Sequence, residues 1–134
     1  MFRFPDAIDI IIAVAEEHDF SVDTQMIRDT TPNPLIPDSL AVENLPFVHL
    51  VGTGGTNNGP FAVQDVQARV YSTSEITSRD AARLFCDLLS NGPQDGGDAG
   101  VVDRVQATSP VMVDSGYANR VQHNAMLSCD LRAL

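Results

Sequence analysis

Three groups of residues in this sequence have the chemical types that catalytic or ligand-binding sites use. The first is the glycine-rich segment 51–60, VGTGGTNNGP. A phosphate-binding loop needs the backbone amides of a helix N-terminus and a closing Lys with Ser or Thr, and a dinucleotide-binding loop also leads into a helix. The sequence contains no lysine, and the residues after Pro60 have the alternation of a strand. We therefore interpret the segment as a loop of a hairpin and predict no nucleotide site.

Pairs of acidic residues form the second group and would suit metal binding or glycoside hydrolysis. Asp95 and Asp98 flank two glycines, but this segment lacks the regularly spaced oxygen ligands of a calcium loop. Glu16 and Glu17 are adjacent on a predicted helix, so their side chains point in different directions. Solvated surface acids explain both pairs, and we predict no metal ion and no cofactor.

Histidine and cysteine form the third group. His18, His49 and His123 follow neither HxxxH nor HExxH spacing. His49 and His123 could lie on neighbouring strands and meet a cysteine, but a nucleophilic cysteine must be exposed and activated. Cys86 and Cys129 fall on apolar faces, so we expect two reduced thiols in the core. No GxSxG motif is present either, and we predict that the protein is not an enzyme.

Two helices are expected to position these residues. The first covers Pro5–His18, where apolar residues recur at the three- and four-residue spacing of one buried stripe. Proline suits its first turn, and acids there complement the helix dipole. The second helix covers Thr77–Ser90, with Thr77 as its cap and Asp80 completing a capping-box-like pair. It ends at the sequence Asn-Gly-Pro that follows Ser90.

Four strands are predicted. The strand over 47–51 is apolar on both faces, those over 61–72 and 119–131 alternate apolar with polar residues, and a further strand covers 101–108. The last strand has the best pattern. Six of its residues face one way, namely Val121, His123, Ala125, Leu127, Cys129 and Leu131. A proline-rich segment, 30–45, should form an extended connector, with a short edge strand possible at 24–30. A break is expected from Pro110 to Gly116.

This order favours an α+β fold: a four-stranded antiparallel sheet, with two main helices packed on one face and extended loops. Residues 1–134 form one domain in this interpretation. The opposite sheet face carries many polar residues, so it is either wet or a contact surface.

The composition narrows the class of protein further. The formal net charge is −10, which argues against a protein that binds duplex DNA through a basic face. No apolar run reaches the ~18 residues of a membrane span, and the run near the N-terminus is too short for a secretory signal. We therefore expect a protein of the cytoplasm or of a particle assembled there. Eight arginines without a lysine indicate a GC-rich genome.

The order of elements resembles the tail terminator (tail completion) family of long-tailed bacteriophages, particularly those that infect actinobacteria. The resemblance covers nearly the whole chain: a helix, a proline-rich connector ending in LPFVHLVGTGG, a long strand, an alanine-containing helix, a glycine-rich loop and a last strand ending in DLR. Its most specific part runs from Pro46 to Gly55 and into the long strand. Arg120 and the alternation of the last strand support it.

The resemblance implies a virion protein of a siphovirus tail, located at the head–tail junction. It would form a ring, expected to be a hexamer, that caps the tail tube, stops its polymerisation and docks the head. Its partners would be further copies of itself, the tail tube protein and the head-completion or neck proteins, with no membrane. DNA would only pass through the lumen, where acidic residues would repel it.

In such a ring, loops would carry the contacts and order on assembly. The segments expected to do so are Thr53–Pro60, Thr30–Asp38 and Asp95–Gly100. The assembly-contact residues singled out in the first and last of these are Thr53, Gly54, Gly55, Thr56, Asn57, Asn58, Gly59, Pro60, Asp95, Gly96, Gly97 and Asp98. Arginines placed against acids across the subunit interface would offset the repulsion between acidic copies.

Three alternatives remain open at this point. Another neck or head-completion protein would share the size, the compartment and the lack of catalytic groups. A small cellular enzyme or ligand-binding domain would use the glycine-rich loop, and its ligand would raise the melting temperature. A cellular adaptor without any viral connection is the third, and the neighbouring genes would identify it.

Overall fold

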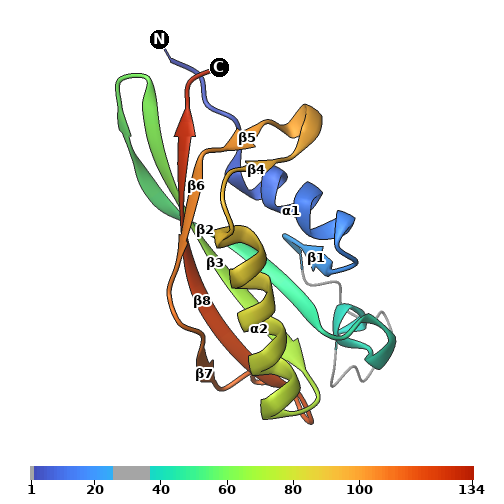
Figure 1. The fold of residues 1–134 in the computed structure, drawn as a ribbon. Helices are drawn as coiled ribbons and strands as arrows, with labels where there is room; N and C mark the ends of the chain where they lie inside the picture. Colours follow the sequence, from blue (N-terminus) through green and yellow to red (C-terminus); the bar gives the residue numbers. More distant parts are fainter. Residues whose placement is uncertain (1, 26–36) are drawn as a thin grey trace.

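A computed structural model of the chain describes residues 2–25 and 37–134. Figure 1 shows the order of the helices and strands along the chain. Their bounds are α1 (Ala7–Glu17), β1 (Ser21–Asp23), η1 (Asp38–Leu40), η2 (Val42–Asn44), β2 (Phe47–Asn58), β3 (Phe61–Ser72), α2 (Glu75–Ser90), β4 (Gln94–Asp95), η3 (Gly97–Ala99), β5 (Val101–Val102), β6 (Arg104–Ala107), β7 (Val111–Val113) and β8 (Val121–Arg132). Here η denotes a single 3₁₀ turn.

The first helix begins two residues later than predicted. Asp6 is its N-cap, and the Asp6 carboxylate accepts a hydrogen bond of 2.9 Å from the backbone N–H of Ile8. Pro5 therefore precedes the helix, because Asp6 can cap a free N–H of the first turn, whereas Phe4, which would be the cap of a helix beginning at Pro5, has no side-chain acceptor. Its buried residues are Ala7, Ile10, Ile11, Val14 and Ala15.

The second helix begins before the predicted cap. Ser74 is the N-cap, and it forms a reciprocal pair with Thr77, the third helical residue. The N–H of Thr77 donates to Ser74 Oγ at 3.2 Å, and the N–H of Ser74 donates to Thr77 Oγ1 at 3.3 Å. The capping box is thus Ser74 with Thr77, and the predicted pair of Thr77 with Asp80 is wrong. With Ser74 as the cap, the side chain of Thr77 is free to accept the second hydrogen bond of the pair, from the N–H of Ser74.

One sheet runs through the described residues in the order β1-β2-β3-β8-β6, with β7 also paired to β8, so that it has six strands. Its pairs are antiparallel except that β1 runs parallel to β2. The mixed α+β class with two helices and a mostly antiparallel sheet is confirmed. The predicted number of four strands is wrong.

The additional strands are short, which is why alternation did not reveal them. β1 has three residues, and β7 consists of three exposed residues inside the predicted break after Pro110. The predicted strand 101–108 is divided at Asp103 into β5 and β6. β5 leaves the main sheet to pair with β4. The predicted edge strand at 24–30 lies almost entirely outside the described residues.

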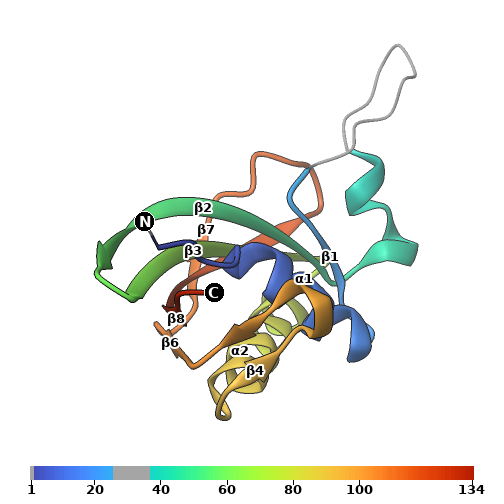
Figure 2. The ribbon, with the colours of Figure 1, turned by 90° about the horizontal axis from the view of Figure 1, so that it is seen from above.

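Both helices cover the same face of the sheet, as predicted. Figure 2 shows the curved sheet on one side with α1 and α2 beneath it. The core between them joins apolar residues of both helices to the inward-facing residues of β2, β3 and β8. The predicted face of the last strand is confirmed: Ala125, Leu127, Cys129 and Leu131 are buried, and His123 lies among them.

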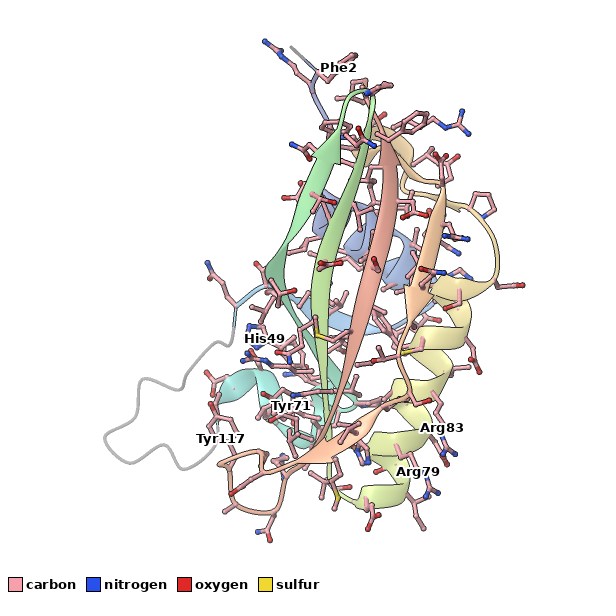
Figure 3. All side chains as sticks on the ribbon, turned by 90° about the vertical axis from the view of Figure 1, so that its left-hand side faces the viewer. Phe2, His49, Tyr71, Arg79, Arg83 and Tyr117 are labelled. Atoms are coloured by element: carbon pink, nitrogen blue, oxygen red, sulfur yellow. The ribbon has the colours of Figure 1, made fainter. Side chains whose placement is uncertain are left out.

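The opposite sheet face, which we call the outer face, is covered at one end only. Leu40, Phe47 and Tyr71 form a second buried cluster there, against which Leu45 and Tyr117 pack. Figure 3 views this face, with Tyr71 and Tyr117 at its covered end and both helices behind the sheet. The described part of the connector, residues 37–45, is not extended as predicted, since 3₁₀ turns η1 and η2 bring Leu40 onto the sheet.

Candidate assembly surface

The glycine-rich segment forms part of a long hairpin and not a loop. β2 continues to Asn58 and pairs with β3 up to Phe61, so the turn consists of Gly59 and Pro60 alone. The prediction of a loop over Thr53–Pro60 is therefore wrong. We call residues 52–61 the arm, because every residue in this range is exposed. Figure 1 shows the arm at the end of the molecule where both chain termini lie.

Two glycines of the arm belong to a bulge, whereas Gly59, with a φ of 59°, belongs to the turn. The register of β2 against β3 shifts between Gly52 and Gly54, so one extra residue lies on β2. Gly54 and Gly55 both have positive φ angles, 129° and 152°. A Cβ at Gly55 would clash with the carbonyl oxygen of Val63, whereas a Cβ at Gly54 would meet nothing within 4 Å. Glycine residues, which are also typical of turns, therefore mark a β-bulge in β2 here.

Both chain termini lie beside the tip of the arm. The N–H of Ala133 donates to the carbonyl oxygen of Pro60, and the N–H of Leu134 donates to that of Arg3, each at 2.7 Å. Large apolar side chains at this end stay in solvent: Phe2 is 56% exposed, Phe61 57% and Leu134 84%. Exposed apolar groups brought together in this way are typical of a surface that contacts another molecule.

The second predicted contact segment, Asp95–Gly100, forms a turn packed against α1. Asp95 Oδ1 accepts a hydrogen bond of 2.8 Å from the N–H of Gly97, and the N–H of Gly96 donates to the carbonyl oxygen of Gly100 at 2.8 Å. A Cβ at Gly96 would lie 3.1 Å from Ile10 Cα. Figure 1 places this turn and the arm on opposite sides of the molecule. The two predicted segments do not form one surface.

The third predicted contact segment, Thr30–Asp38, lies outside the described residues except for its last two. Asp38 begins η1, and its carbonyl oxygen accepts from the side-chain amide of Asn44 at 3.0 Å. A nearby hollow of about 330 Å³ is lined by Glu16, Asp23 and Asp38 among others. Its acidic lining suits a cationic group better than a phosphate.

The edge of the sheet opposite the arm is also exposed. β6 and β7 each pair only with β8 within the described part of the chain. β7 presents three consecutive apolar residues to solvent, Val111 at 62%, Met112 at 53% and Val113 at 36% exposed. β6 lies within the predicted strand 101–108, but sequence reasoning missed β7, which falls in the break expected from Pro110 to Gly116. Three apolar residues directly after a proline, without polar alternation, were the available signal.

His49 and His123 are not neighbours, which corrects the possibility considered from the sequence. β3 separates their strands, and the register pairs His49 with Arg69 but His123 with Val70, so the two rings lie on opposite sheet faces. His49 Nε2 lies 3.1 Å from the carbonyl oxygen of Thr24. Burial lowers the pKa of both histidines. They form no paired site with each other.

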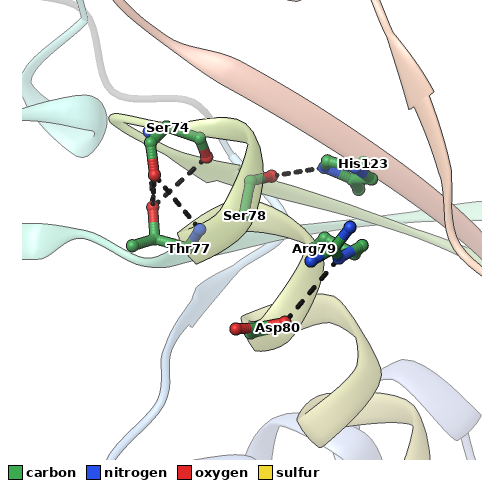
Figure 4. Close-up of polar contacts among 6 residues, drawn as sticks. All are labelled: Ser74, Thr77, Ser78, Arg79, Asp80 and His123. Carbon is green, nitrogen blue, oxygen red and sulfur yellow. Dashed lines mark hydrogen bonds and ion pairs between the residues drawn. The ribbon is translucent and has the colours of Figure 1, made fainter.

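The buried histidine has a serine partner instead, as Figure 4 shows. His123 Nδ1 lies 2.8 Å from Ser78 Oγ, which donates to the carbonyl oxygen of Val70 at 3.0 Å. Ser78 is fully buried and His123 is 3% exposed, so no substrate reaches this pair. A serine that donates to the backbone is not poised as a nucleophile. The contact joins α2 to β3 and β8 and acts in packing.

Both cysteines are buried and free, as predicted. Burial raises the pKa of the Cys86 thiol to about 11 and that of the Cys129 thiol to about 12. At neutral pH both are therefore protonated and weakly nucleophilic.

No group of three or more His, Cys, Asp or Glu side chains within residues 2–25 and 37–134 is placed to hold a metal ion. No helix in the described ranges is long and apolar enough to cross a membrane. The sequence matches no protein-family model and no curated protein. The surfaces that stand out are thus the arm with the neighbouring termini and the β6–β7 edge.

Proposed function

We propose that this protein is a non-enzymatic tail terminator of a long-tailed bacteriophage, which assembles as a ring on the end of the tail tube and stops its growth. The observation that carries the proposal is the arm. All of its residues are exposed and none of them carries a charged side chain, in a chain whose formal net charge is −10. Such a surface suits contact with protein, because no acidic repulsion opposes it.

The apolar end of the molecule gives the ring a second contact surface. Phe2, Phe61 and Leu134 lie at the same end as the tip of the arm. Copies arranged with their long strands along the ring axis would present these side chains together on one rim. We assign that rim to the contact with the tail tube and the opposite rim to the neck proteins. The order of elements set out from the sequence is the second support.

A polymerisation assay with purified tail tube protein tests the proposal. Adding this protein while tubes grow should shorten them in proportion to the amount added, as seen by negative-stain electron microscopy. The matched control replaces the exposed apolar end with Phe2→Ser and Leu134→Ser, and it should lose most of the effect while keeping its unfolding curve. Tubes of unchanged length at every concentration would contradict the terminator role.

A neck protein is the second candidate, supported by the same apolar end. It would bind tubes that are already capped and would leave their length unchanged, so the assay separates the two. A ligand-binding domain predicts instead a rise in melting temperature with nucleotides, sugars or metal ions.

A further inference from the structure

We propose that the free edge of β2 in the arm adds as an extra strand to the β6–β7 edge of a second copy of this chain. The sheet would then continue from one subunit into the next. This inference rests on the proposed ring and names the surfaces that build it.

Within the described residues, two edges of the sheet lack a partner strand along most of their length. β1 covers β2 only from Phe47 to His49, so the part of β2 in the arm has β3 on one side and no strand of the described chain on the other. At the far side of the sheet β6 and β7 end the order. Unpaired backbone N–H and C=O groups along an edge recruit a further strand unless the edge is protected.

The polarity of the strands suits this pairing. β2, β3, β8 and β6 alternate in direction, since each pair is antiparallel. β2 therefore runs opposite to β6 and β7. When a second copy lies beside the first in the same orientation, its arm meets the β6–β7 edge in antiparallel sense, which is the more stable arrangement.

The arm and β6 also lie at the same level of the sheet. The register aligns Thr56 with Val63, Val63 with Asp130, and Asp130 with Arg104, so these four residues form one row on the outer face. A neighbour related by rotation about an axis parallel to the strands would place its Thr56 beside Arg104. A tilt of the strands would shift the arm along the edge toward β7.

Charge favours a second copy at this edge. No residue between Glu43 and Asp65 is acidic or basic apart from His49. The arm thus lacks the charged side chains that protect exposed edges, and its one proline is in the turn. On the other edge, the exposed Arg104 pairs with Asp130 at 3.2 Å and offsets its charge, and Val111 and Met112 are more than half exposed. Two acidic copies can approach here without bringing their acidic surfaces together.

The two edges belong to opposite sides of one sheet, so the contact is heterologous. Each copy then offers one free edge after binding, and the chain of contacts ends only when a ring closes. Pairing between two β2 edges would instead form a closed dimer. This difference makes the inference testable with engineered cysteines.

Cysteine cross-linking of the purified protein tests the inference. The reaction is carried out in about 1 M salt, where the screening length of roughly 3 Å suppresses the repulsion between acidic copies. Thr56→Cys is combined in turn with Arg104→Cys, Gln106→Cys, Val111→Cys or Val113→Cys, all on the outer face and the free edge. Residues opposite each other on neighbouring strands have their Cα atoms roughly 4.4–6.8 Å apart, which is the separation that a disulfide needs. The native thiols are buried and do not interfere.

We expect at least one double variant to give a ladder of oligomers under mild oxidation, with at least tenfold more product than either single variant. Dimers from Thr56→Cys alone would indicate β2–β2 pairing and overturn the inference. Rings seen by native mass spectrometry without a cross-link in any double variant would overturn strand addition but leave the proposed function standing. Monomers without cross-links would also overturn the inference. The proposed terminator function would then be tested separately by the tube-length assay.

A backbone variant gives an independent test. Asn58 and Phe61 flank the two-residue turn and pair across it, so the N–H of Asn57 points to the free edge. Asn57→Pro removes that donor without removing a hydrogen bond of the hairpin, whereas Asn57→Ala keeps it. We expect the proline variant to weaken self-association at least tenfold relative to the alanine variant, with the same unfolding curve. Equal association of the two variants would contradict strand addition.

Discussion

The buried contact between Ser78 and His123 predicts a measurable loss of stability when the serine hydroxyl is removed. Ser78 Oγ has one hydrogen, which it donates to the carbonyl oxygen of Val70, so it accepts from the N–H at His123 Nδ1. Ser78→Ala leaves that N–H buried without a partner, at a cost of about 1–3 kcal/mol. The higher helix propensity of alanine offsets roughly 0.5 kcal/mol. We expect a net loss of about 0.5–2.5 kcal/mol in the free energy of unfolding.

Urea unfolding measures this loss directly. With a dependence of about 2 kcal/mol per molar urea, the middle of the range for small proteins, the midpoint should fall by roughly 0.3–1.2 M at unchanged slope. Ser90→Ala is the matched control, because Ser90 is exposed at the end of the same helix and its hydroxyl makes no buried contact. An unchanged midpoint for Ser78→Ala would refute the reasoning. So would a nitrogen NMR spectrum that shows the His123 proton on Nε2 in the folded protein.

Other predictions concern pH, the helix cap, the thiols and the bulge. Burial lowers the folded-state pKa of His49 and His123, so the unfolded state binds protons first as the pH falls. The free energy of unfolding should therefore be steady above pH ~6.5 and decrease below it. Urea unfolding at about pH 7.5 and 5.5 measures this decrease, and equal stability at the two pH values would contradict the prediction. Ser74→Ala should lower the free energy of unfolding by about 1 kcal/mol, whereas the control Thr73→Ala, at an exposed residue outside the capping box, should change it little. Equal urea midpoints for the two variants would show that the capping box does not stabilise the fold. With pKa values of about 11 and about 12, Cys86 and Cys129 should resist a thiol reagent in the folded protein and react once it is denatured; fast labelling of the native chain would argue against their burial. Gly55→Ala should speed amide hydrogen exchange in the arm more than Gly54→Ala, because only the first clashes with Val63, and identical exchange in both would show that the bulge does not need glycine there.

The elements with long periodic patterns could be predicted from the sequence. β3 has the predicted bounds, and β8 differs from its prediction by two residues at the start and one at the end. Both rely on a buried face in strict alternation, which fixes the register of a strand. The buried thiols followed from the same patterns, because Cys86 and Cys129 fall on apolar faces of the second helix and the last strand.

The assembly surface could be predicted only in part. The sequence indicated residues 53–60, but it placed them in a loop, since four glycines lie within residues 52–59. Glycine is equally suited to a turn and to a bulge, and only the register with β3 distinguishes them. β7 was missed because all three of its residues are exposed. An exposed strand lacks the alternation that burial imposes, so its pairing depends on contacts remote in sequence.

The cover over one end of the outer face could not be predicted either. Leu40 and Tyr117 are far apart in the chain and meet over Phe47 and Tyr71. Arg120 fixes this arrangement, since its Nε donates to the carbonyl oxygen of Leu40 at 2.8 Å. Single apolar residues in polar segments carry no periodicity, so their burial becomes visible only in the fold.

The most direct test of the central claim is negative-stain electron microscopy of lysates from the phage with a nonsense mutation in this gene. The proposed function predicts headless tails of uncontrolled, excessive length, and a copy of the gene supplied in trans should restore normal tails. Tails of normal length beside unjoined heads would move the protein to the neck. Intact virions would contradict the assembly role altogether.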